Sequence, residues 1–106
     1  MSAEIEVGEF VPIAGMRYSI QLRDTILTED GESCFGLTDT VNKIIYLLTS
    51  YATPELFFET WCHEVSEAAN CELRLGLECD QIERLAQVMT QAMLNWFAMD
   101  DDGPIN

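Results

Sequence analysis

Positively charged residues are scarce in this chain, with five lysines and arginines against nineteen aspartates and glutamates and a net charge of −14. Because such a chain repels phosphate groups, we expect no direct binding to DNA or RNA. An anionic membrane surface is excluded for the same reason. The charge favours a basic protein partner instead, and it suits a protein that imitates nucleic acid. It also serves solubility, so charge alone defines no function.

The sequence has no long apolar run. None approaches the roughly 20 residues that a membrane-spanning helix needs. The start, MSAEIEVGEF, lacks the basic and then apolar layout of a signal peptide. We therefore expect a cytoplasmic protein, in which the four cysteines are reduced thiols. None of them forms a C-x-x-C pair.

Linkers, repeats and shifts in composition are also missing, so we predict one domain over residues 1–106. Apolar residues make up 48% of the chain, enough for a core. Residues 1–15 contain several glutamates with Pro12 and Gly15, and we expect an irregular lead-in there. Residues 100–106, DDDGPIN, are expected to be a disordered acidic tail.

Two segments have the pattern of β-strands. Residues 17–23, RYSIQLR, alternate between polar and apolar side chains, which indicates a half-buried strand. Residues 43–48, KIIYLL, predict a second and more apolar strand, and residues 36–39, GLTD, suit a short strand at the sheet edge. Between them, Asp30-Gly31 favours a tight hairpin turn, or a longer loop because its flanks look irregular.

A strong helix start follows the strands. Thr53 is a capping residue, Pro54 suits the first helical position, and Glu55 meets the positive end of the helix dipole. Apolar residues then recur every three or four positions for some 20 residues. Gly76 is placed to end this helix.

A second helix is predicted from Asp80 to about Met99. Asp80 and Glu83 have the spacing of a capping box. The short link at residues 75–79 makes the two helices antiparallel neighbours. Trp96, together with Phe97 and Met99, could close the core or form a dimer face. The apolar stripe consists of Ile82, Leu85, Ala86, Met89, Ala92, Met93, Trp96 and Phe97.

This order of elements predicts an α+β fold. We expect a small, mainly antiparallel sheet of two or three strands, packed on an antiparallel hairpin of two helices.

The only histidine lies in the first of these helices, in the sequence His63-Glu64-Val65-Ser66-Glu67. A helix with H-E-x-x-H binds zinc through two histidines, and the glutamate between them is the general base. Here Glu67 takes the place of the second histidine. Because residues four apart share a helix face, His63 and Glu67 point the same way. Glu64 lies beside this pair.

An open catalytic zinc site needs a third protein ligand. Glu83, early in the second helix, is the best candidate, and Glu78 and Asp80 are alternatives. One imidazole with carboxylates would accept zinc, and on ligand type also manganese or iron. The simpler interpretation is that His63 bonds a carbonyl, that Glu64 and Glu67 are a solvated acidic face, and that Glu83 only caps its helix.

The chain resembles the small zincin-like metallopeptidase-fold proteins of bacteriophages, with HExxE in place of HExxH. The resemblance covers roughly residues 17–95. It rests on RYSIQLRD, Gly36-Leu37-Thr38-Asp39, KIIYLL, ETWCHEVSEAAN and QIERLAQVM.

This resemblance implies a minimal zincin core, in which a small sheet packs on the active-site helix and a second helix supplies the last ligand. By position, it implies His63, Glu67 and Glu83 as zinc ligands and Glu64 as the catalytic base, with a peptide as substrate. It also implies the host cytoplasm as location. The chain departs from the family's motif at Glu67, where the motif has its second histidine. Arg74, Arg84 or Tyr46 would have to replace the usual oxyanion helper.

The sequence therefore supports two hypotheses. The first is a phage-type zincin-like protein, metal-binding or derived from a metal-binding ancestor. The second is a non-enzymatic acidic interaction protein, such as a nucleic-acid mimic or anti-defence inhibitor, that binds a basic partner protein.

Overall fold

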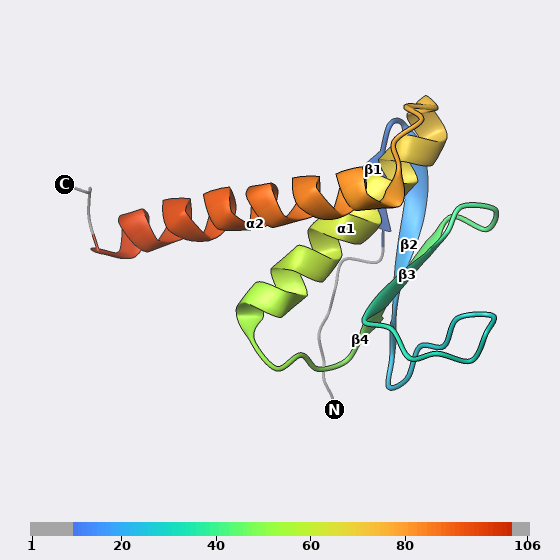
Figure 1. The fold of residues 1–106 in the computed structure, drawn as a ribbon, viewed down its shortest axis with the longest axis horizontal. Helices are drawn as coiled ribbons and strands as arrows, with labels where there is room; N and C mark the ends of the chain where they lie inside the picture. Colours follow the sequence, from blue (N-terminus) through green and yellow to red (C-terminus); the bar gives the residue numbers. More distant parts are fainter. Residues whose placement is uncertain (1–9, 103–106) are drawn as a thin grey trace.

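A computed structural model describes residues 10–102 of the chain, and the side chains up to Trp96. Four strands precede two helices (Figure 1). The elements are β1 (Phe10–Ile13), β2 (Met16–Arg23), β3 (Gly36–Asp39), β4 (Ile44–Leu48), α1 (Pro54–Leu73) and α2 (Cys79–Asp102). The protein is thus α+β, as predicted.

The strands form one mixed sheet in the order β1-β2-β4-β3. The central β2 and β4 are parallel, whereas β1 pairs with β2 and β3 pairs with β4 in antiparallel fashion. Residues 24–35 carry the chain past the end of β4 to the edge strand β3. Within this loop, the Gly31 N–H donates to the Thr28 carbonyl, so Asp30-Gly31 forms a tight turn inside a longer loop. The edge position of β3 is as predicted.

The sheet has four strands, where we expected two or three, because β1 lies in the stretch that we expected to be irregular. Ile13 pairs with Met16, and the two residues between them, Ala14 and Gly15, both have positive φ, of 52° and 82°. Two such residues make the turn that joins twisted antiparallel strands. Ala-Gly is a weak sequence signal for this turn. Pro12 is tolerated because β1 is an edge strand.

At the other end of the chain, α2 continues through Asp102, so residues 100–102 are helical instead of part of a disordered tail. Residues 1–9 and 103–106 lie outside the described part, and the predictions for them stand untested. Within the described residues, no helix is both long and apolar enough to cross a membrane.

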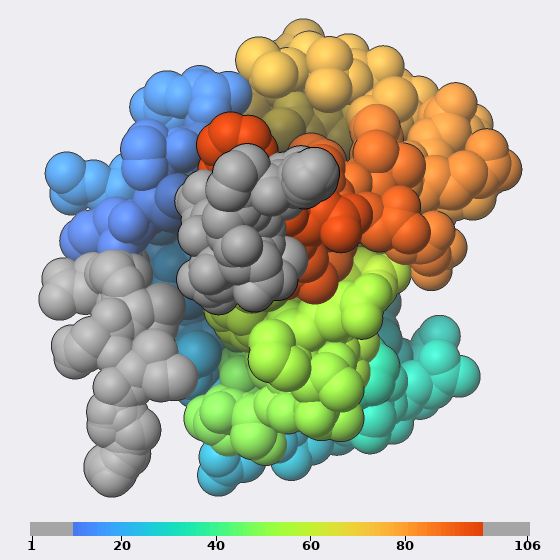
Figure 2. Space-filling model, turned by 90° about the vertical axis from the view of Figure 1, so that its left-hand side faces the viewer, coloured from blue at the N-terminus to red at the C-terminus, as the bar shows by residue number. Residues whose placement is uncertain are grey.

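Sheet, α1 and α2 follow one another as layers (Figure 1). The first helix covers the sheet, and α2 packs mainly on α1. The expected hairpin is present, but only one of its helices lies against the sheet. In Figure 1 the two helices spread apart with distance from their link, and in Figure 2 α2 (orange to red) lies beside α1 (yellow-green) on the outer surface.

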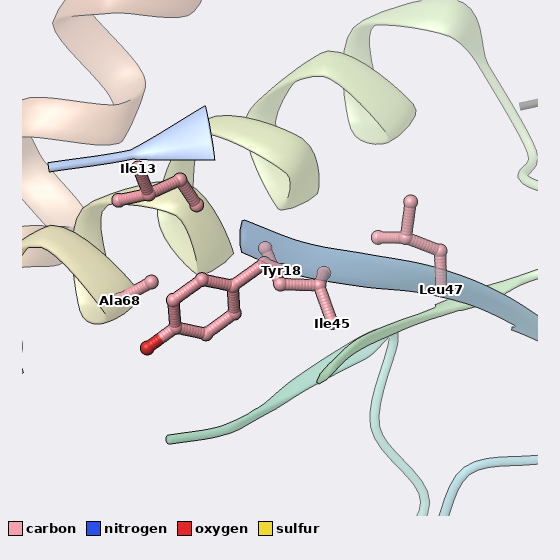
Figure 3. Packing of buried hydrophobic residues seen from close by; sticks show 5 residues of the cluster. All are labelled: Ile13, Tyr18, Ile45, Leu47 and Ala68. Atoms are coloured by element: carbon pink, nitrogen blue, oxygen red, sulfur yellow. The ribbon is translucent and has the colours of Figure 1, made fainter. Parts of the chain in front are cut away.

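The core lies between the sheet and α1. Tyr18, Ile45 and Leu47 from the central strands meet Ile13 and Ala68 (Figure 3). Tyr18 has no exposed surface, as the alternation of its strand predicts. Its hydroxyl donates to Glu72 Oε2 at 2.6 Å, and Lys43 pairs with the same carboxylate. This network ties the last turns of α1 to the sheet.

The helix starts combine a confirmed prediction with a wrong one. Thr53 caps α1, since its hydroxyl accepts from the Leu56 N–H at 3.0 Å. The expected capping box at Asp80 is displaced: the Gln81 side chain accepts from the Glu78 N–H, and Asp80 pairs with Arg84. Because α2 begins at Cys79, Asp80 already lies within its first turn.

The end of α1 also differs in detail. Arg74, not Gly76, is the left-handed residue that closes the helix, with φ of 54°. Asn70 exchanges hydrogen bonds with the backbone of Leu77 and so fixes the link to α2.

Candidate functional site

A cleft of about 440 Å³ lies between the start of β3, the first half of α1 and the start of α2. It contains three of the four residues predicted for the site, namely His63, Glu64 and Glu83. The full lining is Cys34, Phe35, Gly36, Leu56, Glu59, Thr60, His63, Glu64 and Glu83. Residues from distant parts of the sequence therefore meet where the motif predicts a site.

His63 and Glu67 are in contact. His63 Nε2 lies 3.2 Å from Glu67 Oε2, one helical turn away, and both side chains are partly exposed. Two ligand atoms bound tetrahedrally to one zinc, with bonds of about 2.0–2.1 Å, lie about 3.4 Å apart. The spacing of this pair is thus close to that of two ligands on one ion. It equally satisfies the two groups as a simple hydrogen-bonded pair.

Glu64 faces the sheet and is 8% exposed. Its Oε1 accepts a hydrogen bond of 2.7 Å from the Thr38 hydroxyl in β3. Burial raises the pKa of Glu64 above its ordinary value, although the Thr38 hydrogen bond and neighbouring His63 act in the opposite direction. A carboxyl group with a raised pKa in a cleft is a candidate for general acid–base chemistry.

The approach of β3 to α1 depends on Gly36. A Cβ at this position would lie 2.7 Å from Thr60 Cγ2 and 3.0 Å from Glu64 Cγ. Any larger residue would therefore push the edge strand away from Glu64. Gly36 and Thr38 belong to the GLTD segment, which carries part of the resemblance, but neither residue was predicted for the site. Their two-residue spacing, which puts both on one face of a strand, was the available signal.

Glu83 lines the cleft from the start of α2. It does not complete a three-ligand set: within residues 10–102, no three His, Cys, Asp or Glu side chains lie close enough to hold one ion. The residue types fit a divalent cation, and the spacing of His63 and Glu67 fits two of its ligands. Glu83 would have to move toward them to become the third.

The candidates for an oxyanion helper lie elsewhere. Arg84 pairs with Asp80 on the exposed side of α2, and Arg74 caps α1. Tyr46 contacts Arg23 across a cation–π distance of 5.2 Å, away from the residues that line the cleft. These positions give no support to an oxyanion role for any of the three.

Comparisons of the chain with models of protein families, with curated proteins and with solved structures found no match.

Proposed function

We propose that this is a zincin-like protein of the phage type, which binds a divalent metal ion at the mouth of the cleft. His63, Glu67 and Glu83 are the proposed ligands, zinc is the first choice of metal, and manganese or iron suits the same ligands. The observation that carries the proposal is the cleft, which is lined by the His63 imidazole, the buried Glu64 and Glu83 from another helix, with Glu67 in contact with His63.

A metal ion bound there would act as a Lewis acid toward a water molecule or a peptide carbonyl. The chain's own contribution is Glu64. Thr38 orients its carboxylate, and burial raises its pKa, so that it can take a proton from a group in the cleft. Peptide hydrolysis is the reaction that this arrangement would support.

Metal binding is tested by titrating chelator-treated protein with zinc in a calorimeter and by following the melting temperature. We expect about one ion per chain and a higher melting temperature with zinc, since binding to the folded state stabilises it. His63→Ala and Glu83→Gln should each weaken binding by more than the roughly 10–100-fold that loss of an outer-shell partner costs.

Glu29→Gln is the matched control for Glu83→Gln, because it also removes one negative charge, but from an exposed loop. It should bind zinc like the wild type. If zinc neither binds nor changes the melting temperature, the metal proposal is wrong. If zinc binds and a fluorogenic peptide is cut, Glu64→Gln should lower the rate about 10²–10⁴-fold.

We propose the cytoplasm as its location, that of the host if a phage encodes the protein. All four cysteines lie in the described part of the chain, and all are free thiols. Free thiols are typical of proteins in a reducing compartment.

A basic protein partner is the second candidate function. Three of the residues that line the cleft are the glutamates Glu59, Glu64 and Glu83, in a chain with a net charge of −14. Binding through such a surface should weaken steeply with salt. Pull-down with lysine-rich and neutral bait peptides, at two salt concentrations, tests this function. Binding that ignores salt would contradict it.

A further inference from the structure

Much of α2 exposes apolar side chains that the described part of the chain leaves uncovered. The side chains of Ile82, Ala86 and Thr90 are buried, while Met93 and Leu94 are half-buried. The exposed ones are Leu85 (45%), Val88 (61%), Met89 (37%) and Trp96 (62%). The sequence pattern placed Leu85, Met89 and Trp96 in one apolar stripe with the buried residues. Within the described residues, only one side of that stripe is buried.

The exposed residues have the spacing of a helix–helix contact. Leu85, Met89, Ala92 and Trp96 follow one another at steps of four, three and four residues, the heptad pattern of paired helices. Successive residues of a helix are rotated by about 100° around its axis, so these four side chains occupy a sector roughly 60° wide. The centre of this sector is turned by about 90° around the axis from the side that meets α1. The face can therefore receive another helix while α1 stays in place.

Charge indicates what covers this face. Residues 85–99 contain no charged side chain, and this is the longest uncharged run in a chain with a net charge of −14. An acidic surface would attract a basic partner, but this uncharged face offers no electrostatic attraction to one. Two copies of the same acidic chain, by contrast, repel each other least where their contact is uncharged.

The exposed stripe of α2 is also complementary in shape to the same stripe of a second copy. When two copies of α2 run antiparallel, about a twofold axis between residues 90 and 91, Leu85 meets Trp96 and Met89 meets Ala92 of the other copy. Larger side chains then oppose smaller ones, as well-packed layers require. A parallel arrangement would instead set Asp100, Asp101 and Asp102 beside the same three residues of the other copy.

We propose that the protein forms an antiparallel homodimer through the Leu85–Trp96 face of α2. The contact is about 16 Å long, because eleven residues separate its ends at 1.5 Å each. Such a short interface predicts a weak dimer that dissociates on dilution. Added salt should tighten it, since salt screens the repulsion between the two acidic chains.

Sedimentation equilibrium over a range of concentrations, at low and moderate salt, tests the dimer. Met89→Glu should weaken it by at least about tenfold, because it would bury an unpaired charge. Gln87→Glu is the matched control: it adds the same charge to an exposed position on the far side of the helix. Circular dichroism and thermal melting check that both variants are folded.

A wild type that stays monomeric at high concentration in both salts would overturn the proposal. So would a Met89→Glu variant that is folded and dimerises like the wild type, or a Gln87→Glu variant that fails to dimerise.

Cross-linking tests the orientation. With Cys34, Cys71 and Cys79 replaced by serine and the buried Cys62 kept, Ala92→Cys should cross-link to itself through a short bis-maleimide. Leu85→Cys should not, because the axis places its two copies about 16 Å apart along the helix. Efficient self-linking of Leu85→Cys would overturn the antiparallel arrangement.

Discussion

Glu64 is a carboxylate that folding removes from water. It keeps one strong partner, the Thr38 hydroxyl at 2.7 Å, and no described lysine or arginine pairs with it. Burial of a carboxylate in this way costs stability unless the charge is compensated. A protein that keeps such a residue at a cleft trades stability for a group with altered proton affinity.

This cost can be measured with Glu64→Gln, which keeps the shape and an oxygen that accepts from Thr38. The raised pKa means that the folded protein holds its proton after the unfolded chain has lost it. The contribution of Glu64 to stability should therefore fall as pH rises from the ordinary glutamate pKa through the raised one. Glu64→Gln lacks this fall, so its free energy of unfolding at pH 7 should exceed that of the wild type by roughly 1 kcal/mol.

Urea unfolding between pH 4 and 8 is the measurement, and the exposed Glu29→Gln serves as the control. A difference between Glu64→Gln and the wild type that does not grow with pH would show that Glu64 is not penalised by burial.

The contact between His63 and Glu67 could be predicted at this scale, because i, i+4 geometry is local to one helix. The burial of Glu64 could not. The sequence placed it beside the pair, but only the approach of β3 encloses it. The same holds for Thr38, which lies 26 positions earlier in the chain.

At the scale of elements, β3 and α1 form the wall of the cleft, and their close approach depends on the absence of a side chain at Gly36. Gly36→Ala should lower the free energy of unfolding by about 1–3 kcal/mol, because its Cβ would lie 2.7 Å from Thr60 Cγ2. Urea denaturation at neutral pH measures the change.

Thr60→Ser removes that methyl group and provides the matched test. The double variant should recover part of the loss, which gives a coupling energy in a double-mutant cycle. If the two substitutions are simply additive, the contact between β3 and α1 is not what limits the residue at Gly36.

The boundaries of the central strands and of both helices were predictable within a few residues, because alternation, capping and periodicity are local signals. The pairing of β1 was missed, since its turn uses Ala14-Gly15 in place of a stronger signal. The parallel pairing of β2 and β4 was also missed, because it depends on a loop passing the end of β4, which no periodicity encodes.

At the scale of the whole molecule, net charge acts on the entire fold. With −14 on 106 residues, self-repulsion favours the expanded chain at low salt. We expect the melting temperature to rise by a few degrees between about 0.02 and 0.3 M sodium chloride. The added salt shortens the Debye length to less than about 10 Å and so screens the repulsion between the carboxylates. Differential scanning fluorimetry at low protein concentration, where the chain is monomeric, measures this rise. A melting temperature that falls with salt would show that favourable ion pairs outweigh the repulsion.

The sequence by itself determined the α+β class, the strands and helices that carry the site, and the placement of His63 and Glu67 on one face of α1. These follow from the periodicity of the backbone, which neighbouring residues express locally. The tertiary structure decided that Glu64 is buried against β3, that Glu83 shares its cleft without completing three ligands, and that α2 leaves an apolar side exposed. Each of these depends on contacts between residues far apart in the chain, where the packing of whole layers outweighs any local pattern.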